Sequence, residues 1–107
     1  MGKRRGVIWS PESVGDLAGL HDRIAVHDGD AADSYVAQVL DSVEMVSEHP
    51  RSVVRLIGVP LEGEFRSVVV RNHRVVYRLT EDGVRVYRIW DCRQDPAGLW
   101  SSLEAAE

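Results

Sequence analysis

The chain has 107 residues, of which 44% are hydrophobic and 28% are charged, and its formal net charge is -4. This length accommodates one domain with a single modest core and excludes a second domain. No apolar run approaches the roughly 18 residues of a membrane span, so we expect a cytoplasmic protein without a signal peptide or a membrane partner.

Charge is distributed unevenly along the chain. Residues 12–48 contain nine acidic residues against one basic residue, a balance of -8. Residues 66–93 contain seven arginines against three acidic residues, a balance of +4. The first region should repel nucleic acid and the second can attract it, although acidic helices and basic strands also keep a protein in solution.

The N-terminal half predicts a short strand followed by a helical hairpin. The apolar run 7–9 ends at Ser10, which can cap a helix that begins at Pro11 and extends to about residue 26. A turn at residues 27–30 leads to a second helix, which ends near residue 48, before Pro50. The apolar stripes expected to be buried are Val14, Leu17, Leu20 and Ile24 in the first helix and Val36, Val39, Leu40, Val43 and Val46 or Ser47 in the second.

The C-terminal half predicts a three-stranded antiparallel meander over residues 64–93. Three runs rich in Val, Ile and Tyr are separated by residues 71–72 and 80–83. The preceding segment 52–57 is either a short edge strand or an extended linker, and residues 96–103 predict a short last helix. This order predicts an α+β fold, in which the helical hairpin packs on one face of a mainly antiparallel sheet and the other face stays open.

Alternation with period two assigns the strand side chains to the two faces. The set with the better core character is His73, Val75, Tyr77 and Leu79, which leaves Arg74, Val76 and Arg78 exposed. In the last strand, Val84, Val86, Arg88 and Trp90 share one face, and Arg85, Tyr87 and Ile89 share the other. We expect the arginines to gather over the open face, where phosphate binding, docking of an acidic partner and surface solubility are all possible roles.

Residues for acid, base or metal chemistry are few. His73 lies on the expected core face, where a hydrogen-bonded structural histidine is the ordinary interpretation. Cys92 is the single cysteine, which excludes an internal disulfide bond and a zinc site built from cysteines. We expect no metal and no cofactor. Tyr77, Tyr87, Trp90 and Trp100 can stack on bases, but at alternating strand positions aromatic residues more often belong to the core.

The order of three stretches is familiar: VIWSPESVGDL, then AADSYVAQVLDSVEMVSEHPR, then FRSVVVRNHRVVYRLTEDGVRVYRIWDCRQDP. It resembles the RelE/ParE superfamily of toxins from bacterial type II toxin-antitoxin systems. The most telling part is Arg66, followed by HRVVYR, an acidic turn and a V-x-V-x-x-I strand that ends in Arg93. The resemblance covers Val7 to about Pro96 and implies one toxin domain over residues 1–107.

One class of this superfamily consists of ribosome-dependent mRNA interferases. The resemblance places Arg74 at the catalytic arginine of YoeB-like toxins, and Arg66 and Arg93 would assist it in such an enzyme. Arg55 falls where those toxins have a glutamate base, and Cys92 falls where they have a histidine, so no acid and base pair remains. RelE-like enzymes use a set of lysines, which this chain lacks beyond its N-terminus.

The other class, the ParE-like toxins, inhibits DNA gyrase without known active-site chemistry and has a longer helical hairpin. The stretch HDGDAADSYVAQVLDSVEMVSEHP is similar to that longer hairpin. The resemblance therefore favours a ParE-like toxin that acts on gyrase over an interferase that acts on mRNA at the ribosome. A member that has lost toxicity and serves as a binding module is a third interpretation.

The resemblance leads to a prediction of partners. We expect a toxin that inhibits growth, stabilises plasmids and is neutralised by a cognate antitoxin. Carboxylates of the antitoxin would form charge-assisted hydrogen bonds with the arginines and mask the working face. The residues expected to contact the target or the antitoxin are Arg66, Arg71, Arg74, Arg78, Arg85, Arg93 and Trp90.

Overall fold

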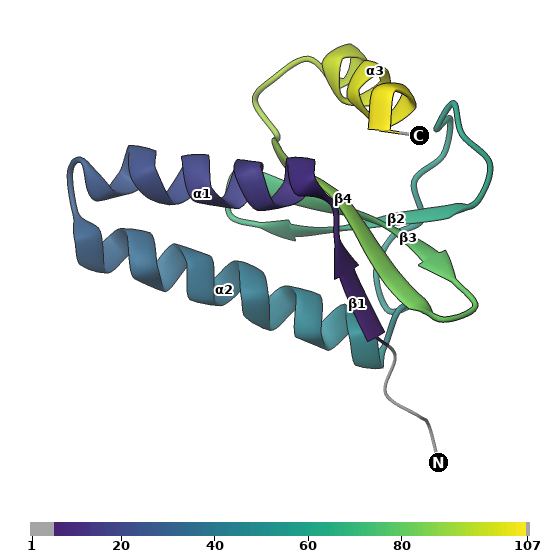
Figure 1. Ribbon diagram of the computed structural model, residues 1–107, viewed down its shortest axis with the longest axis horizontal. Helices are drawn as coiled ribbons and strands as arrows, with labels where there is room; N and C mark the ends of the chain where they lie inside the picture. Colours follow the sequence, from purple (N-terminus) through teal and green to yellow (C-terminus); the bar gives the residue numbers. More distant parts are fainter. Residues whose placement is uncertain (1–5, 107) are drawn as a thin grey trace.

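The computed structural model describes residues 6–106 and contains four strands and three helices in that range (Figure 1). Along the chain, one strand is followed by two helices, then by three strands in a meander, and then by a third helix. The elements are β1 (Gly6–Trp9), α1 (Pro11–Ala25), α2 (Gly29–Glu48), β2 (Glu64–Val70), β3 (His73–Thr80), β4 (Gly83–Asp91) and α3 (Pro96–Ala106). The predicted α+β fold and the predicted elements are confirmed.

The four strands form one sheet in the order β1-β4-β3-β2. The meander β2-β3-β4 is antiparallel, as predicted, while β1 pairs in parallel with β4. Gly83 begins β4 opposite Gly6 with φ 152°, and a Cβ atom at Gly83 would collide with the backbone oxygen of Gly6. A glycine is therefore needed where the first and last strands approach each other.

The antiparallel hairpin of α1 and α2 covers one face of the sheet, here called the helix side (Figure 1). Each helix begins at a side-chain cap, Ser10 for α1 and Asp28 for α2. The core on the helix side confirms the predicted strand face. It consists of Leu20, Tyr35, Val39, Val43 and Val46 from the helices and Val70, Val75, Tyr77, Leu79, Val84, Val86 and Ile89 from the strands.

Three members of the predicted helical stripes, Val14, Val36 and Leu40, do not join the core. Val14 is 54% exposed and Leu40 is 46% exposed, whereas Ser13 is buried in place of Val14. Val46 and Ser47, the two alternatives for the last position of the second stripe, are both buried. Each of these serines donates a hydrogen bond to a backbone carbonyl three residues earlier, at 2.8 Å and 2.6 Å. A hydroxyl that is satisfied within its own helix can occupy a buried position without an unpaired polar group.

The second face of the sheet is not open, so this prediction is wrong. Phe65, Val76 and Tyr87 are each at most 1% exposed and form a second core with Leu99 and Leu103 of α3. The segment that leaves α2 completes this cover and forms an isolated bridge rather than a strand, between Arg55 and Arg66. The partly buried residues around this core are Leu56, Val59, Leu61, Trp90 and Trp100. We call this the α3 side.

A β-bulge changes the face assignment in β4. Val76 of β3 lies opposite Arg88, but the next residue, Tyr77, lies opposite Val86, so Tyr87 is the additional residue. Tyr87 therefore packs on the α3 side and Ile89 on the helix side, so the prediction that these two residues share one face is wrong. Simple alternation fails here because one strand contains one residue more than its neighbour.

No helix in residues 6–106 is long and apolar enough to cross a membrane.

Candidate functional site

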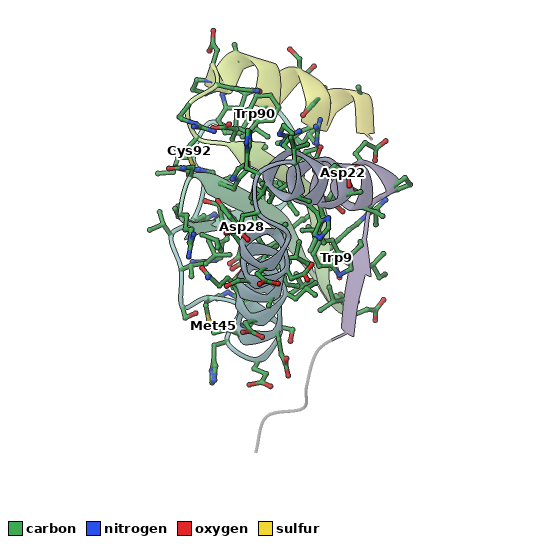
Figure 2. All side chains as sticks on the ribbon, turned by 90° about the vertical axis from the view of Figure 1, so that its left-hand side faces the viewer. Trp9, Asp22, Asp28, Met45, Trp90 and Cys92 are labelled. Carbon is green, nitrogen blue, oxygen red and sulfur yellow. The ribbon has the colours of Figure 1, made fainter. Side chains whose placement is uncertain are left out.

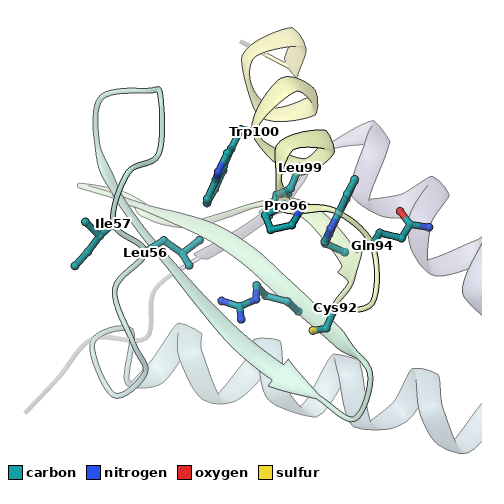
Figure 3. A pocket seen from close by; sticks show the side chains of 9 residues that line it. Leu56, Ile57, Cys92, Gln94, Pro96, Leu99 and Trp100 are labelled. Carbon is teal, nitrogen blue, oxygen red and sulfur yellow. The ribbon is translucent and has the colours of Figure 1, made fainter.

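A groove on the α3 side lies between the chain that follows α2 and the start of α3 (Figure 3). Figure 3 shows Leu56 and Ile57 on one wall, Trp100 and Leu99 on the other, and Cys92 at the end of β4. The groove has a volume of about 210 Å³. It is lined by Leu56, Ile57, Arg74, Trp90, Cys92, Gln94, Pro96, Leu99 and Trp100. We call it the Arg74 groove.

Arg74 is the cation of this groove. The sheet places it in a cross-strand row, opposite Val69 on β2 and Trp90 on β4. Its Nη1 donates to Ser67 Oγ at 3.0 Å, and no carboxylate in residues 6–106 forms an ion pair with it. A half-buried guanidinium among apolar walls suits an anionic group, carboxylate or phosphate, that brings apolar surface with it.

Trp90 is the second predicted binding residue that lines the Arg74 groove. Its indole Nε1 is buried and has no hydrogen-bond partner among the described residues. Arg88 lies over the Trp90 ring at 5.6 Å and is held there by Asp16 of α1, at 2.7 and 2.8 Å. An unpartnered indole N–H beside a cation is suited to an oxygen acceptor from a ligand.

Two other predicted arginines share the α3 side but lie away from the groove. Arg78 and Arg85 are opposite each other in the sheet. Arg78 stacks on Phe65 at 6.0 Å, and Arg85 stacks on Tyr87 at 5.4 Å. Their guanidinium groups therefore cover the aromatic part of the second core instead of joining Arg74.

The remaining predicted arginines lie elsewhere on the molecule. Arg66 is opposite Tyr77, whose ring belongs to the core of the helix side, and forms an ion pair with Glu64 at 2.8 Å. Arg71 lies in the β2–β3 turn over the Tyr35 ring. The expected gathering of the arginines over one open face is thus wrong, because α3 covers part of that face and the strand register places Arg66 on the other face.

Arg93 also does not join Arg74. It follows β4 and forms a bidentate pair with Asp91, at 2.9 and 2.7 Å. The Arg93 guanidinium holds the pKa of the Asp91 carboxyl below its ordinary value. The three side chains proposed for an interferase, Arg66, Arg74 and Arg93, do not line one common groove among the described residues.

His73 is buried on the helix side, as predicted, and faces away from its neighbour Arg74. Its Nδ1 is 2.7 Å from the Tyr35 hydroxyl, which also accepts a hydrogen bond from the backbone N–H of Asn72. Burial lowers the pKa of His73, and the nearby Arg23 lowers it further, against the carboxylate of Asp91. A neutral histidine on the opposite face cannot act as acid or base in the Arg74 groove.

Leu56 and Ile57 are groove residues that the sequence prediction missed, and Trp100 is a groove residue that the sequence suggested only as a possible base-stacking side chain. Leu56 and Ile57 belong to segment 52–57, for which the sequence is compatible with either an edge strand or a linker, and Ile57 is 89% exposed. The signal in the sequence is that this segment is apolar without strand-like alternation. Such a segment can remain at the surface without pairing fully to the sheet and still present apolar side chains for binding.

In the part of the chain that the structure describes, no group of three His, Cys, Asp or Glu side chains is arranged to hold a metal ion.

Comparison with known proteins places this architecture in a family. Residues 7–96 match the model of the ParE toxin of the type II toxin-antitoxin system parDE. A solved structure titled "Chromosomal ParDE TA system from P. aeruginosa" has a TM-score of 0.70 at 18% identity, covering 82% of this chain and 96% of that chain, and so shares the fold. No match was found among curated proteins. Since the family match spans most of the sequence, this chain belongs to the ParE toxin family of type II toxin-antitoxin systems.

Proposed function

We propose that the protein inhibits DNA gyrase in the bacterial cytoplasm and that a cognate antitoxin neutralises it. The observation that supports this most strongly is the match to the ParE toxin model over residues 7–96. A long helical hairpin, with an α2 of 20 residues, agrees with the ParE-like class. Growth inhibition and plasmid stabilisation follow from this proposal as the expected roles of such a toxin.

The Arg74 groove supports a binding function more than a nuclease function. Arg74 and Cys92 are its ionisable side chains, and neither a carboxylate nor a histidine of the described residues lines it. Cleavage of RNA by a 2′-hydroxyl needs a base and an acid within hydrogen-bond reach of the reacting atoms. An unpaired guanidinium with two tryptophans and aliphatic walls is instead suited to holding a protein segment.

Two assays on the same purified protein test the target. With gyrase, ATP and plasmid DNA, we expect cleaved DNA to accumulate, and expression without antitoxin should induce the SOS response. The alternative, an mRNA interferase, predicts cleavage of mRNA on programmed ribosomes that Arg74→Ala abolishes. Cleavage of mRNA without any effect on gyrase would refute the proposed target, and inactivity in both assays together with normal growth would support a non-toxic module.

The antitoxin is tested with the product of the neighbouring reading frame. We expect it to form a stable complex with the protein and to restore both growth and gyrase activity. For variants of the Arg74 groove, Arg55→Gln is the matched control, because Arg55 is exposed and its side chain does not line that groove. A neighbouring product that binds without restoring growth would count against neutralisation.

A further inference from the structure

Three depressions meet around the end of β4. The Arg74 groove shares Trp90 and Gln94 with a depression of about 200 Å³ beside α1. That depression shares Arg23, His73 and Asp91 with a cleft of about 530 Å³ near the tip of the helical hairpin. Consecutive depressions share lining residues, so they follow one another around the end of β4 from the α3 side to the helix side, and we call this series of depressions the track.

Figure 2 views the molecule from the tip of the hairpin, where this track lies. Trp90 and Cys92 are between α3 above and Asp28 at the start of α2 below. The backbone N–H of Cys92 donates to the carbonyl of Asn72 at 2.8 Å, which joins the end of β4 to the β2–β3 turn. This bond anchors residues 90–94, here called the ridge, whose members line all three depressions.

The two ends of the track each carry an arginine without a carboxylate partner in residues 6–106. At one end this is Arg74, and at the other it is Arg23, the single base of the acidic hairpin. Nη1 of Arg23 lies 3.3 Å from the position of a Cβ atom at Gly19, so its side chain extends back along α1 over the track. By contrast, Arg88 and Arg93 along the track are already neutralised by bidentate pairs.

The track has apolar walls at both ends. Leu20 and Ile24 line the cleft near Arg23, and Ile57 and Trp100 line the groove near Arg74. Two buried nitrogen atoms without a hydrogen-bond partner among the described residues lie beneath it, Trp90 Nε1 and His73 Nε2. Apolar walls with a few unpaired polar groups are the features by which proteins recognise an extended chain.

The charges distinguish a protein from a nucleic acid as the occupant. Asp16, Asp28 and Asp91 line the track, and residues 12–48 as a whole have a charge balance of -8. A phosphate backbone with one charge for each nucleotide would be repelled there, whereas a peptide with two separated carboxylates would meet Arg23 and Arg74 without crowding these acids.

We propose that one extended segment of the cognate antitoxin lies along this track and places one carboxylate on Arg74 and a second on Arg23, with apolar side chains against the walls at each end. This inference rests on the proposed neutralisation by an antitoxin and adds where and by which chemistry it binds. The same occupant closes the Arg74 groove, so one segment both binds the toxin and covers its candidate working surface.

The test measures the affinity of the neighbouring reading frame's product for the full chain and for three single variants. We expect Arg23→Gln and Arg74→Gln each to weaken binding by about tenfold or more, the effect of removing one charge-assisted contact. Arg55→Gln, which removes the same charge outside the track, should leave the affinity within about twofold. Thermal unfolding checks that every variant is folded. If Arg74→Gln does not fold, the affinity of Arg23→Gln alone tests the proposal.

Cys92 supplies an independent measurement, since it is exposed and is the single cysteine of the chain. We expect the bound partner to slow its alkylation by iodoacetamide about tenfold or more, because a segment on the ridge shields the thiol. Full affinity in Arg23→Gln, or an unchanged alkylation rate in an intact complex, would refute binding along the track without contradicting neutralisation by the antitoxin. A wild-type chain that binds no neighbouring product would overturn both.

Discussion

Asp16 of α1 and Arg88 of β4 form a bidentate ion pair that connects the helical hairpin to the central sheet. Arg88 Nε is 2.7 Å from Asp16 Oδ2, and Arg88 Nη2 is 2.8 Å from Asp16 Oδ1. The same Oδ2 accepts the backbone N–H of Ile89 at 2.9 Å. Asp16 raises the pKa of Arg88 through these bonds. The pair also fixes Arg88 over Trp90, which links α1 to the Arg74 groove.

We predict that Asp16→Asn destabilises the fold by about 2–3 kcal/mol, because it leaves a mostly buried guanidinium without its counter-charge. The side chains of the pair are only 17% and 20% exposed, so water replaces the lost contact poorly. Urea unfolding monitored by circular dichroism measures the change. Asp41→Asn on the outer surface of α2 is the matched control and should leave the midpoint unchanged. Equal midpoints for both variants would contradict the prediction.

Ser10 has a double role at the start of α1, and we predict that Ser10→Ala costs about 1–2 kcal/mol. Its Oγ accepts the backbone N–H of Ser13 at 3.0 Å and donates to the carbonyl of Tyr87, the bulge residue, at 2.7 Å. Asp28 caps α2 at the exposed tip through one bond to the N–H of Ala31. Asp28→Ala should therefore cost less than Ser10→Ala in the same urea titration. A cost as large for Asp28→Ala would show that the bond to the bulge contributes nothing.

Much of the fold follows from local signals. Ser10-Pro11 marks the start of α1, the period of 3.6 residues gives both helices, and the polar breaks separate the three strands of the meander. Two features depend on contacts between distant parts of the chain. The bulge at Tyr87 is held by Ser10, 77 residues away, and reverses the expected faces. Val76 becomes buried only because α3 returns to the sheet.

The candidate site was less predictable than the fold for the same reason. The sequence predicts Arg74 and Trp90 as site residues, and their row in the sheet follows from the register of the meander. Arg66 was expected to join them, but its place opposite Tyr77 puts it on the other face. The walls of the groove come from α3 and from the segment after α2, whose positions no local pattern specifies.

Two histidines give opposite contributions to the dependence of stability on pH. Burial lowers the pKa of His73 in the folded protein. The unfolded chain therefore takes up a proton below about pH 6.5 while folded His73 does not, and its contribution to stability is lost as the pH falls through this range. The hydrogen bond to Asp33 raises the pKa of His21. That contribution is complete below the unfolded pKa and is lost as the pH rises through the folded value.

We predict that His21→Gln makes stability fall more steeply as the pH decreases from 7, since the His21 contribution then no longer opposes that of His73. His73→Gln in the same background should remove up to one proton of this dependence, at most about 1.4 kcal/mol per pH unit. Unfolding free energies from urea titrations between about pH 5 and pH 8 measure both slopes. An unchanged slope in His73→Gln would show that this imidazole protonates equally in both states.

Leu103 is expected to be the main attachment of α3. It is 0% exposed and packs in the second core with Phe65, Val76 and Tyr87. Leu103→Ala should cost about 2–4 kcal/mol and accelerate amide hydrogen exchange in α3 more than in β3, because the helix can open while the sheet remains paired. Leu40→Ala is the control, since Leu40 is 46% exposed on α2 and should change stability by about 1 kcal/mol or less. Uniform acceleration of exchange across α3 and β3 would show that the helix opens only with the whole domain, and the Arg74 groove would then be a permanent feature of the fold.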